Sequence, residues 1–128
     1  MSHMAVTPKI SDSEWLIMDV LWRRHPATAV EIAQELNPRT QWQDQTVRTM
    51  LRRLIDKKAV KYRADGKTYY YEPAVTREEC VHVESRSFLE RVFGGAAHPL
   101  LVQLTQETKL SAQEIAELKR ILQEKEKR

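Results

Sequence analysis

Basic side chains are concentrated in one stretch of this 128-residue chain, and their chemistry suits a polyanionic partner. Residues 39–67 contain nine Lys or Arg and three acidic residues, whereas the rest of the chain contains 12 basic and 15 acidic ones. A segment of net charge +6 within a chain whose remainder carries −3 is typical of a localised polyanion-binding face. A solvated basic surface is the plain alternative, and charge alone does not decide between them. The basic residues are Arg39, Arg48, Arg52, Arg53, Lys57, Lys58, Lys61, Arg63 and Lys67.

One predicted helix in this stretch carries side chains that can read base pairs. Residues 44–58 place Val47, Met50, Leu51 and Leu54 within about 100° of the helix circumference, which predicts one buried face and one polar face. Arginine can bond guanine through two hydrogen bonds, glutamine can pair with adenine, and threonine can contact a thymine methyl group or a phosphate. Residues further along the helix would meet the backbone instead. The candidate readers are Gln45, Thr46, Arg48 and Thr49, and the candidate backbone contacts are Arg52, Arg53 and Lys57.

A β-hairpin is predicted directly after this helix. Two β-prone runs, residues 60–63 and 68–72, flank Asp65-Gly66, which is a strong short-range hairpin signal. Its tip, from Arg63 to Lys67, would form a wing that grips phosphates or the adjacent minor groove. Three consecutive tyrosines, residues 69–71, alternate in the second strand, so at least one of them should pack inward.

Four capping-box patterns predict four helix starts. In each, a Ser or Thr stands three positions before a Glu, so that the hydroxyl and the carboxylate can each accept from the other residue's N–H. The pairs are Ser11 with Glu14, Thr28 with Glu31, Thr76 with Glu79, and Ser111 with Glu114. The predicted helices span residues 12–24, 29–36, 44–58, 77–93, 98–108 and 112–126. We expect His25-Pro26 and Asn37-Pro38 to end the first two, and Gly94-Gly95 to end the fourth.

The order helix, short helix, helix, hairpin predicts a winged helix-turn-helix. The expected fold class is mainly α with a small β-hairpin, followed by an all-α region. We expect a winged helix-turn-helix domain at residues 10–73 and a helical domain at residues 74–128. Residues 1–9 are expected to form a tail, in which Met1 to Met4 resemble a cloning remnant.

The C-terminal helices are thinly apolar for a core of their own, because roughly 50 residues seldom bury enough surface to fold independently. A second copy of the chain would supply the missing apolar face. The alternative is that these helices pack back onto the N-terminal part in a monomer. The candidate dimerisation residues are Phe88, Val92, Leu100, Leu101, Leu104, Ile115, Leu118 and Leu122.

Catalysis, metal binding and membrane insertion find little support in the sequence. The chain has no nucleophile elbow, no phosphate-cradling glycine loop and no HExxH motif. Cys80 and His82, taken with His25 and His98, form no ligand set of recognisable spacing, and Cys80 is interpreted as a small packing residue. We expect no metal, no cofactor and no enzyme activity. A single cysteine and the lack of a signal peptide or long apolar run favour the cytoplasm.

The segments that carry these patterns resemble the BlaI/MecI penicillinase-repressor family. The similarity involves residues 10–15, 21–22, 46–54, 67–71 and 110–118, and its most specific part is Thr-x-Arg-Thr-x-x-x-Arg-Leu from Thr46 to Leu54. The resemblance implies a homodimeric repressor that binds an inverted repeat through an N-terminal winged helix and dimerises through three C-terminal helices. It also implies DNA contacts for Thr46, Arg48 and Thr49, and a contact near the backbone for Arg53. Gln45 stands where relatives often have lysine.

The resemblance further implies a switch. Relatives are inactivated when a membrane sensor-protease responds to β-lactam and the repressor is cut in its dimerisation helices, which links the family to antibiotic resistance. The matching bond here is Gln103–Leu104, where the best-known relatives have Asn-Phe. Another branch of the family senses copper through C-terminal Cys-x-Cys motifs, which this chain lacks.

Three functional hypotheses remain at this point. A sequence-specific repressor predicts a preference of about 10³-fold or more for one palindrome, and an affinity that falls with salt. A winged-helix protein-interaction module predicts no duplex binding even at low salt. A sequence-blind architectural protein is disfavoured by Gln45, Thr46 and Thr49, because uniform phosphate binding favours Lys and Arg.

Overall fold

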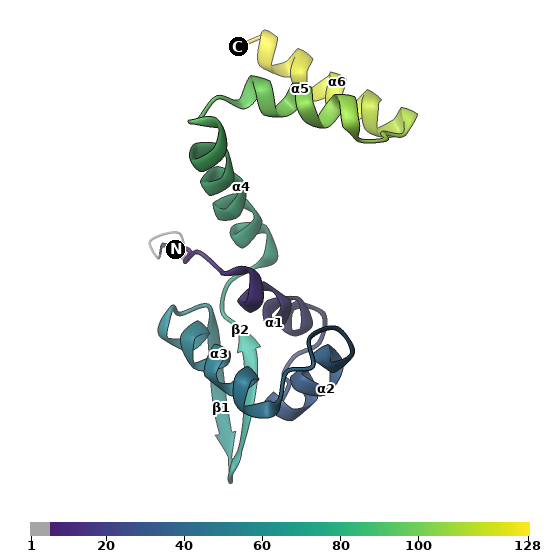
Figure 1. Cartoon of the computed structure of the whole chain (residues 1–128). Helices are drawn as coiled ribbons and strands as arrows, with labels where there is room; N and C mark the ends of the chain where they lie inside the picture. Colours follow the sequence, from purple (N-terminus) through teal and green to yellow (C-terminus); the bar gives the residue numbers. More distant parts are fainter. Residues whose placement is uncertain (1–5) are drawn as a thin grey trace. The chain divides into compact units, whose positions relative to one another are not determined.

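The computed structural model describes residues 6–128 and contains, in that range, six helices and a two-stranded hairpin (Figure 1). Residues 1–5, which include the suspected cloning remnant, lie outside the described residues. The chain divides between Ser87 and Phe88 into two compact units, and the functional boundary expected at residue 73 stays a prediction. The elements are α1 (Asp12–Arg23), α2 (Ala29–Thr40), α3 (Asp44–Asp56), β1 (Val60–Asp65), β2 (Thr68–Pro73), α4 (Arg77–Phe93), α5 (Ala97–Glu107) and α6 (Ala112–Glu126).

The predicted fold class is confirmed, and most helix ends agree with the sequence patterns. α4 and α6 have the predicted bounds, while the ends of α1, α3 and α5 differ by one or two residues. Gly94 and Gly95 follow α4 with φ values of 59° and 87°, a left-handed conformation that glycine adopts without strain.

All four predicted capping boxes are confirmed. Each capping hydroxyl accepts a hydrogen bond of 3.0–3.2 Å from the N–H of the Glu three residues on. Each of those Glu carboxylates accepts one of 2.8–3.0 Å from the N–H of the capping residue. These bonds lower the pKa of Glu31 and Glu114, because backbone N–H groups stabilise the ionised carboxylate. The start of α3 differs, since Gln43 makes no side-chain capping bond.

α2 continues past the proline that was expected to end it. Pro38 lies inside the helix, which ends at Thr40, so the predicted end at Asn37-Pro38 is wrong. Proline gives no N–H to the carbonyl four residues earlier, but its φ is compatible with a helix. Past the proline, the Thr40 hydroxyl donates to the Leu36 carbonyl at 3.0 Å and the Gln41 N–H donates to the Asn37 carbonyl at 2.8 Å. Gln41 then leaves the helix in the left-handed region, with φ 58°.

The hairpin forms where it was predicted, but its loop lies one residue later. β1 and β2 pair antiparallel from Val60 opposite Pro73 to Asp65 opposite Thr68, which leaves residues 66 and 67 as the loop. Gly66 has φ 64°, and a positive φ at the first loop residue alone is the pattern of a type II′ turn.

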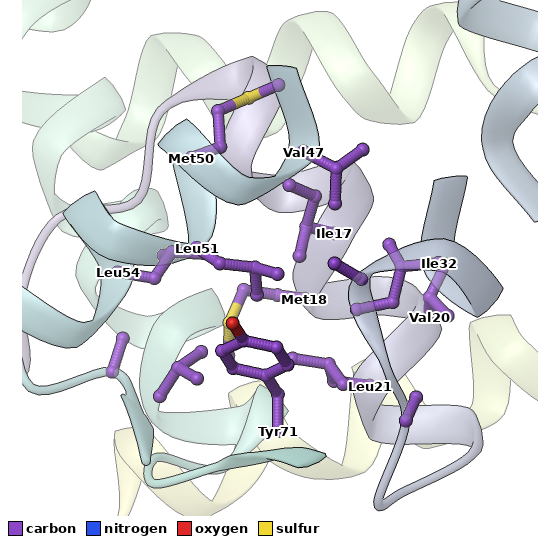
Figure 2. Close-up of a cluster of buried hydrophobic side chains, with 14 of the residues drawn as sticks. Ile17, Met18, Val20, Leu21, Ile32, Val47, Met50, Leu51, Leu54 and Tyr71 are labelled. Carbon is purple, nitrogen blue, oxygen red and sulfur yellow. The ribbon is translucent and has the colours of Figure 1, made fainter. Parts of the chain in front are cut away.

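The first unit has its hydrophobic core where α1, α2, α3 and β2 meet (Figure 2). Ile17, Leu21, Ile32 and Leu51 are fully buried, and Tyr71 is 7% exposed, which confirms that one of the three tyrosines packs inward. Full burial of an aliphatic side chain contributes about 1.5–3 kcal/mol. This cluster therefore fixes the helices that carry the polar face of α3.

A Schellman motif ends α3 and turns the chain into β1. The N–H of Lys58 donates to the Ile55 carbonyl, and the N–H of Ala59 donates to the Leu54 carbonyl, both at 2.9 Å. Ala59 and Leu54 are both fully buried, as is usual for the apolar pair of this motif. Lys58 has φ 67°, at a position that favours glycine.

The second unit, Phe88–Arg128, leaves most of its apolar side chains open in the single chain. Neither α5 nor α6 contains a buried residue. Of the predicted dimerisation residues, Leu100 is half-buried and the others are 39–56% exposed. Within residues 6–128, no helix combines the length and apolar character that crossing a membrane requires.

Candidate nucleic-acid interface

α3 separates its two faces as its sequence pattern predicts. Val47, Met50, Leu51 and Leu54 are at most 5% exposed and face the core. The polar face lies open, so the packing of one side fixes the position of the other. The exposed residues are Gln45, Thr46, Arg48, Thr49, Arg52 and Arg53.

α2 and α3 form a helix-turn-helix pair joined by residues 41–43. Trp42 is partly buried and packs against the core. Its backbone N–H donates to the Thr40 hydroxyl at 3.1 Å, which fixes the turn. In such a pair the second helix is the one that enters the major groove. On α3 the Thr49 hydroxyl donates to the Gln45 carbonyl at 3.0 Å, so its oxygen and methyl group remain for a partner.

Most of the basic residues in the stretch 39–67 are not paired with an acidic side chain. Of the nine, eight form no ion pair with any residue in the described part of the chain. A cation without an internal counter-charge is available to neutralise a phosphate and release a counterion. The stretch therefore has the electrostatic character of a DNA-binding surface.

Lys57 is the exception, because it has internal partners that the sequence pattern did not indicate. Its Nζ lies 2.5 Å from Glu14 Oε1 and donates to the Lys9 carbonyl at 2.9 Å. Burial of Glu14 alone would raise the pKa of its carboxyl. Hydrogen bonds from Lys57 and Ser11, with the charge of Lys57, outweigh burial and hold that pKa below its ordinary value.

The wing carries its own cations. Arg63 lies directly opposite Tyr70 in the register, and its guanidinium stands over that ring at 4.8 Å from the centroid. This stacking orients Arg63 on the outer face of the hairpin. Lys67 is exposed in the loop.

A cleft of about 210 Å³ lies between the polar face of α3 and the wing. Arg48 and Lys67, which were predicted from separate patterns, both line it, whereas Arg53 and Lys57 do not. The cleft is lined by Thr28, Ala29, Val30, Arg48, Lys67, Thr68, Tyr69 and Tyr71.

Two tyrosines beside this cleft were not among the predicted site residues. Tyr62 and Tyr69 are 51% and 50% exposed, and their ring centroids lie 5.2 Å apart. The alternation of the strand places Tyr69 on the same face as the buried Tyr71. The alternation does not predict that Tyr69 is exposed, because its exposure depends on how far the hairpin extends past the helices (Figure 1).

Cys80 is a packing residue, as interpreted from the sequence. It is 1% exposed in the core cluster, and burial, with the charge of Glu79, raises its pKa to about 11. The thiol is therefore protonated near neutral pH and poorly suited to bind a metal. Residues 6–128 contain no group of three or more His, Cys, Asp or Glu side chains that could hold a metal ion.

The Gln103–Leu104 bond lies inside α5. The Gln103 side-chain amide donates to the Glu107 carboxylate, and the Leu104 carbonyl accepts from the Thr108 N–H at 3.0 Å. Leu104 is 50% exposed in the single chain.

Comparison with known proteins agrees with this geometry. The model of the penicillinase repressor family matches residues 10–124. A penicillinase repressor of Bacillus licheniformis is 34% identical over 125 residues, which cover 98% of each chain. The solution structure of the DNA-binding domain of the repressor BlaI is similar with a TM-score of 0.52 and 33% identity, over 57% of this chain and 89% of that one. The monomeric form of Bacillus licheniformis BlaI in complex with the blaP half-operator is similar over the same shares, with a TM-score of 0.50 and 33% identity.

Proposed function

Because this chain belongs to the penicillinase repressor family of winged-helix DNA-binding repressors, we propose that it represses transcription as a homodimer on an inverted-repeat operator. The observation that carries the proposal is the open polar face of α3 beside the wing. There Arg48 and Lys67 line one cleft, and neither has an ion-pair partner among the described residues. A helix of this kind fits the major groove while a hairpin reaches the flanking backbone.

The contacts divide by their position on the two elements. Residues near the start of α3 face base edges, because the first turns of a recognition helix enter the groove most deeply. Residues further along α3 and on the wing neutralise phosphates, which fix register without reading sequence. The base readers are Gln45, Thr46, Arg48 and Thr49, and the phosphate contacts are Arg52, Arg53, Arg63 and Lys67.

Dimerisation is supported by the half-operator complex and by the second unit. The similar BlaI occupies half an operator in its monomeric form, so a full operator calls for two copies. In this chain α5 and α6 bury no side chain of their own, and apolar residues such as Leu101 and Leu122 are more than half exposed. A symmetric partner would cover these faces, since a unit of this size seldom folds on its own.

Inactivation by a membrane sensor-protease in response to β-lactam is the corresponding switch, with Gln103–Leu104 as the cleaved bond. A cut there would separate the end of α5 and all of α6 from the DNA-binding unit. Because the bond lies within a helix, cleavage requires that α5 open locally first. Because operator DNA lies in the bacterial cytoplasm, the proposed role is a cytoplasmic one.

The proposal is tested by selecting DNA from the source genome. Sheared genomic DNA is captured on the purified protein and sequenced, with Arg48→Ala treated in parallel. Enrichment of a few fragments that share one inverted repeat, lost in the variant, is expected. A flat profile for both proteins would refute sequence-specific repression.

A further inference from the structure

Three tyrosines form a row on the inner face of the wing. Tyr62 pairs directly with Tyr71 across the hairpin, with ring centroids 6.2 Å apart, and Tyr69 lies diagonally from Tyr62 at 5.2 Å. The row begins in the core at Tyr71, which is 7% exposed, and emerges at Tyr62 and Tyr69, which are half exposed. The ladder partner of Tyr69 is Ala64, whose small side chain leaves the ring uncovered.

Hairpin stability accounts for the rings of this row but not for their hydroxyls. A cross-strand aromatic pair stabilises a two-stranded sheet through its rings, and phenylalanine would supply the same contact. Within residues 6–128, the hydroxyls of Tyr62 and Tyr69 form no hydrogen bond with another residue. Tyrosine, with an apolar ring and a polar tip, is enriched at interfaces for this reason.

We propose that Tyr62 and Tyr69 form a contact ledge for the sugar–phosphate backbone of DNA, with the rings against deoxyribose and the hydroxyls donating to phosphate oxygens. The inference rests on the proposed function, because it names further contacts of the same interface. Tyr69 lines the cleft that also contains Arg48 and Lys67, so the ledge continues the cationic surface. The positive charge of Lys67, a phosphate contact in the proposed function, draws the backbone to the ledge, and tyrosine hydroxyls are common phosphate donors.

The neighbouring Tyr70 offers a matched control. It lies on the opposite face of β2, where Arg63 covers its ring at 4.8 Å. Tyr70→Phe and Tyr69→Phe remove the same atom from adjacent residues of one strand. A backbone ledge on the inner face therefore predicts that only one of these two changes weakens binding.

The experiment measures the affinity of the full chain for two duplexes by fluorescence anisotropy over a range of salt. One duplex is the operator recovered by genomic capture, and the other has an arbitrary sequence of the same length. Tyr62→Phe and Tyr69→Phe are expected to weaken binding to both duplexes by about three- to tenfold, as for the loss of one hydrogen bond. Tyr70→Phe should bind as the native chain does. Since a hydroxyl releases no counterion, the salt dependence should stay unchanged, whereas Lys67→Ala should reduce its slope by about 0.9.

The ledge is overturned if Tyr62→Phe and Tyr69→Phe bind both duplexes as tightly as the native chain. A loss on the operator alone would also overturn it, because that result means base reading rather than backbone contact. Thermal unfolding of each variant verifies that the hairpin is intact. If the native chain binds neither duplex, the proposed function itself fails and the ledge with it, so the two failures are distinguishable.

Discussion

The ammonium group of Lys57, the residue that follows α3, lies 2.5 Å from a carboxylate oxygen of Glu14 in the first turn of α1. That Glu14 side chain is 3% exposed, and the same oxygen accepts the Ser11 N–H at 3.0 Å to complete the capping box of α1. One buried carboxylate therefore both starts α1 and holds the end of the recognition helix. The orientation of α3 depends on this pair as well as on apolar packing.

Replacing Lys57 with methionine should destabilise the chain strongly. Lys57→Met leaves the Glu14 carboxylate buried without a cation, and breaking such a pair from one side costs about 3–5 kcal/mol. Because Lys57 itself is 33% exposed, we expect about 2–4 kcal/mol, measured by urea unfolding. The double variant Glu14→Gln/Lys57→Met removes both charges while Gln keeps an acceptor for the cap. It should lose clearly less than the single variant, and an equal loss in both would contradict a charge-pair role.

The stability of the chain should depend on the ionisation of Glu14 at acid pH. Its pKa in the folded state lies below the ordinary value of 4.5, so the ionised form adds stability above that pH. This contribution is lost as the pH falls through the lowered folded value. Unfolding free energies of the native chain and Glu14→Gln, measured from about pH 7 to about pH 3, should therefore converge toward acid. A difference that stays constant over this range would show that Glu14 does not titrate as described.

The local part of this fold could be predicted from the sequence, because each pattern is confined to a few neighbouring residues. A capping box needs only two side chains three positions apart, and all four were predicted. The polar and buried faces of α3 follow from helical periodicity alone. The helix end predicted at Asn37-Pro38 was wrong because proline removes a single helical hydrogen bond while its φ still suits a helix, and α2 runs on to Thr40.

The parts of the site that depend on distant residues were not predictable in this way. Glu14 and Lys57 are separated by 43 positions, and no local pattern pairs them. The exposure of Tyr69 depends on where the hairpin leaves the core, and its neighbour Tyr71 on the same face is buried. The convergence of Arg48 and Lys67 on one cleft likewise requires the packing of α3 against the wing.

Arg48 and Lys67 line the same cleft but should respond differently to substitution. Arg48→Ala should cost roughly 1–3 kcal/mol of binding free energy at the operator and relax the base preference there. Lys67→Ala should weaken all duplexes to a similar extent and lower the salt slope by about 0.9. Competition assays with single-base operator variants separate the two effects. Proportional losses on operator and random duplex in both variants would contradict the division into readers and phosphate contacts.

Lys58→Gly should stabilise the chain. Lys58 has φ 67° at the end of α3, and a left-handed conformation costs a non-glycine residue roughly 1–2 kcal/mol. Glycine relieves this strain but loses more backbone entropy on folding, so a net gain of about 0.5–1 kcal/mol is expected. Thermal unfolding should show a rise of a few degrees, roughly 2–6 °C. Lys61→Gly, a change of the same residue type within β1, is the control and should lower stability instead.

The apolar face of α6 provides the test of dimerisation. Leu118 is 41% exposed in the single chain, and in the proposed dimer the partner covers it. Leu118→Asp would place an unpaired charge in that interface, so sedimentation should show monomers at concentrations where the native chain is dimeric. Lys119→Asp introduces the same residue one position along the helix and should leave the dimer intact.

Because a dimer engages both half-sites at once, Leu118→Asp should also bind the operator far more weakly than Lys119→Asp does, while both bind an isolated half-site equally. Dimeric Leu118→Asp would show instead that the exposed face of α6 is not the contact between copies.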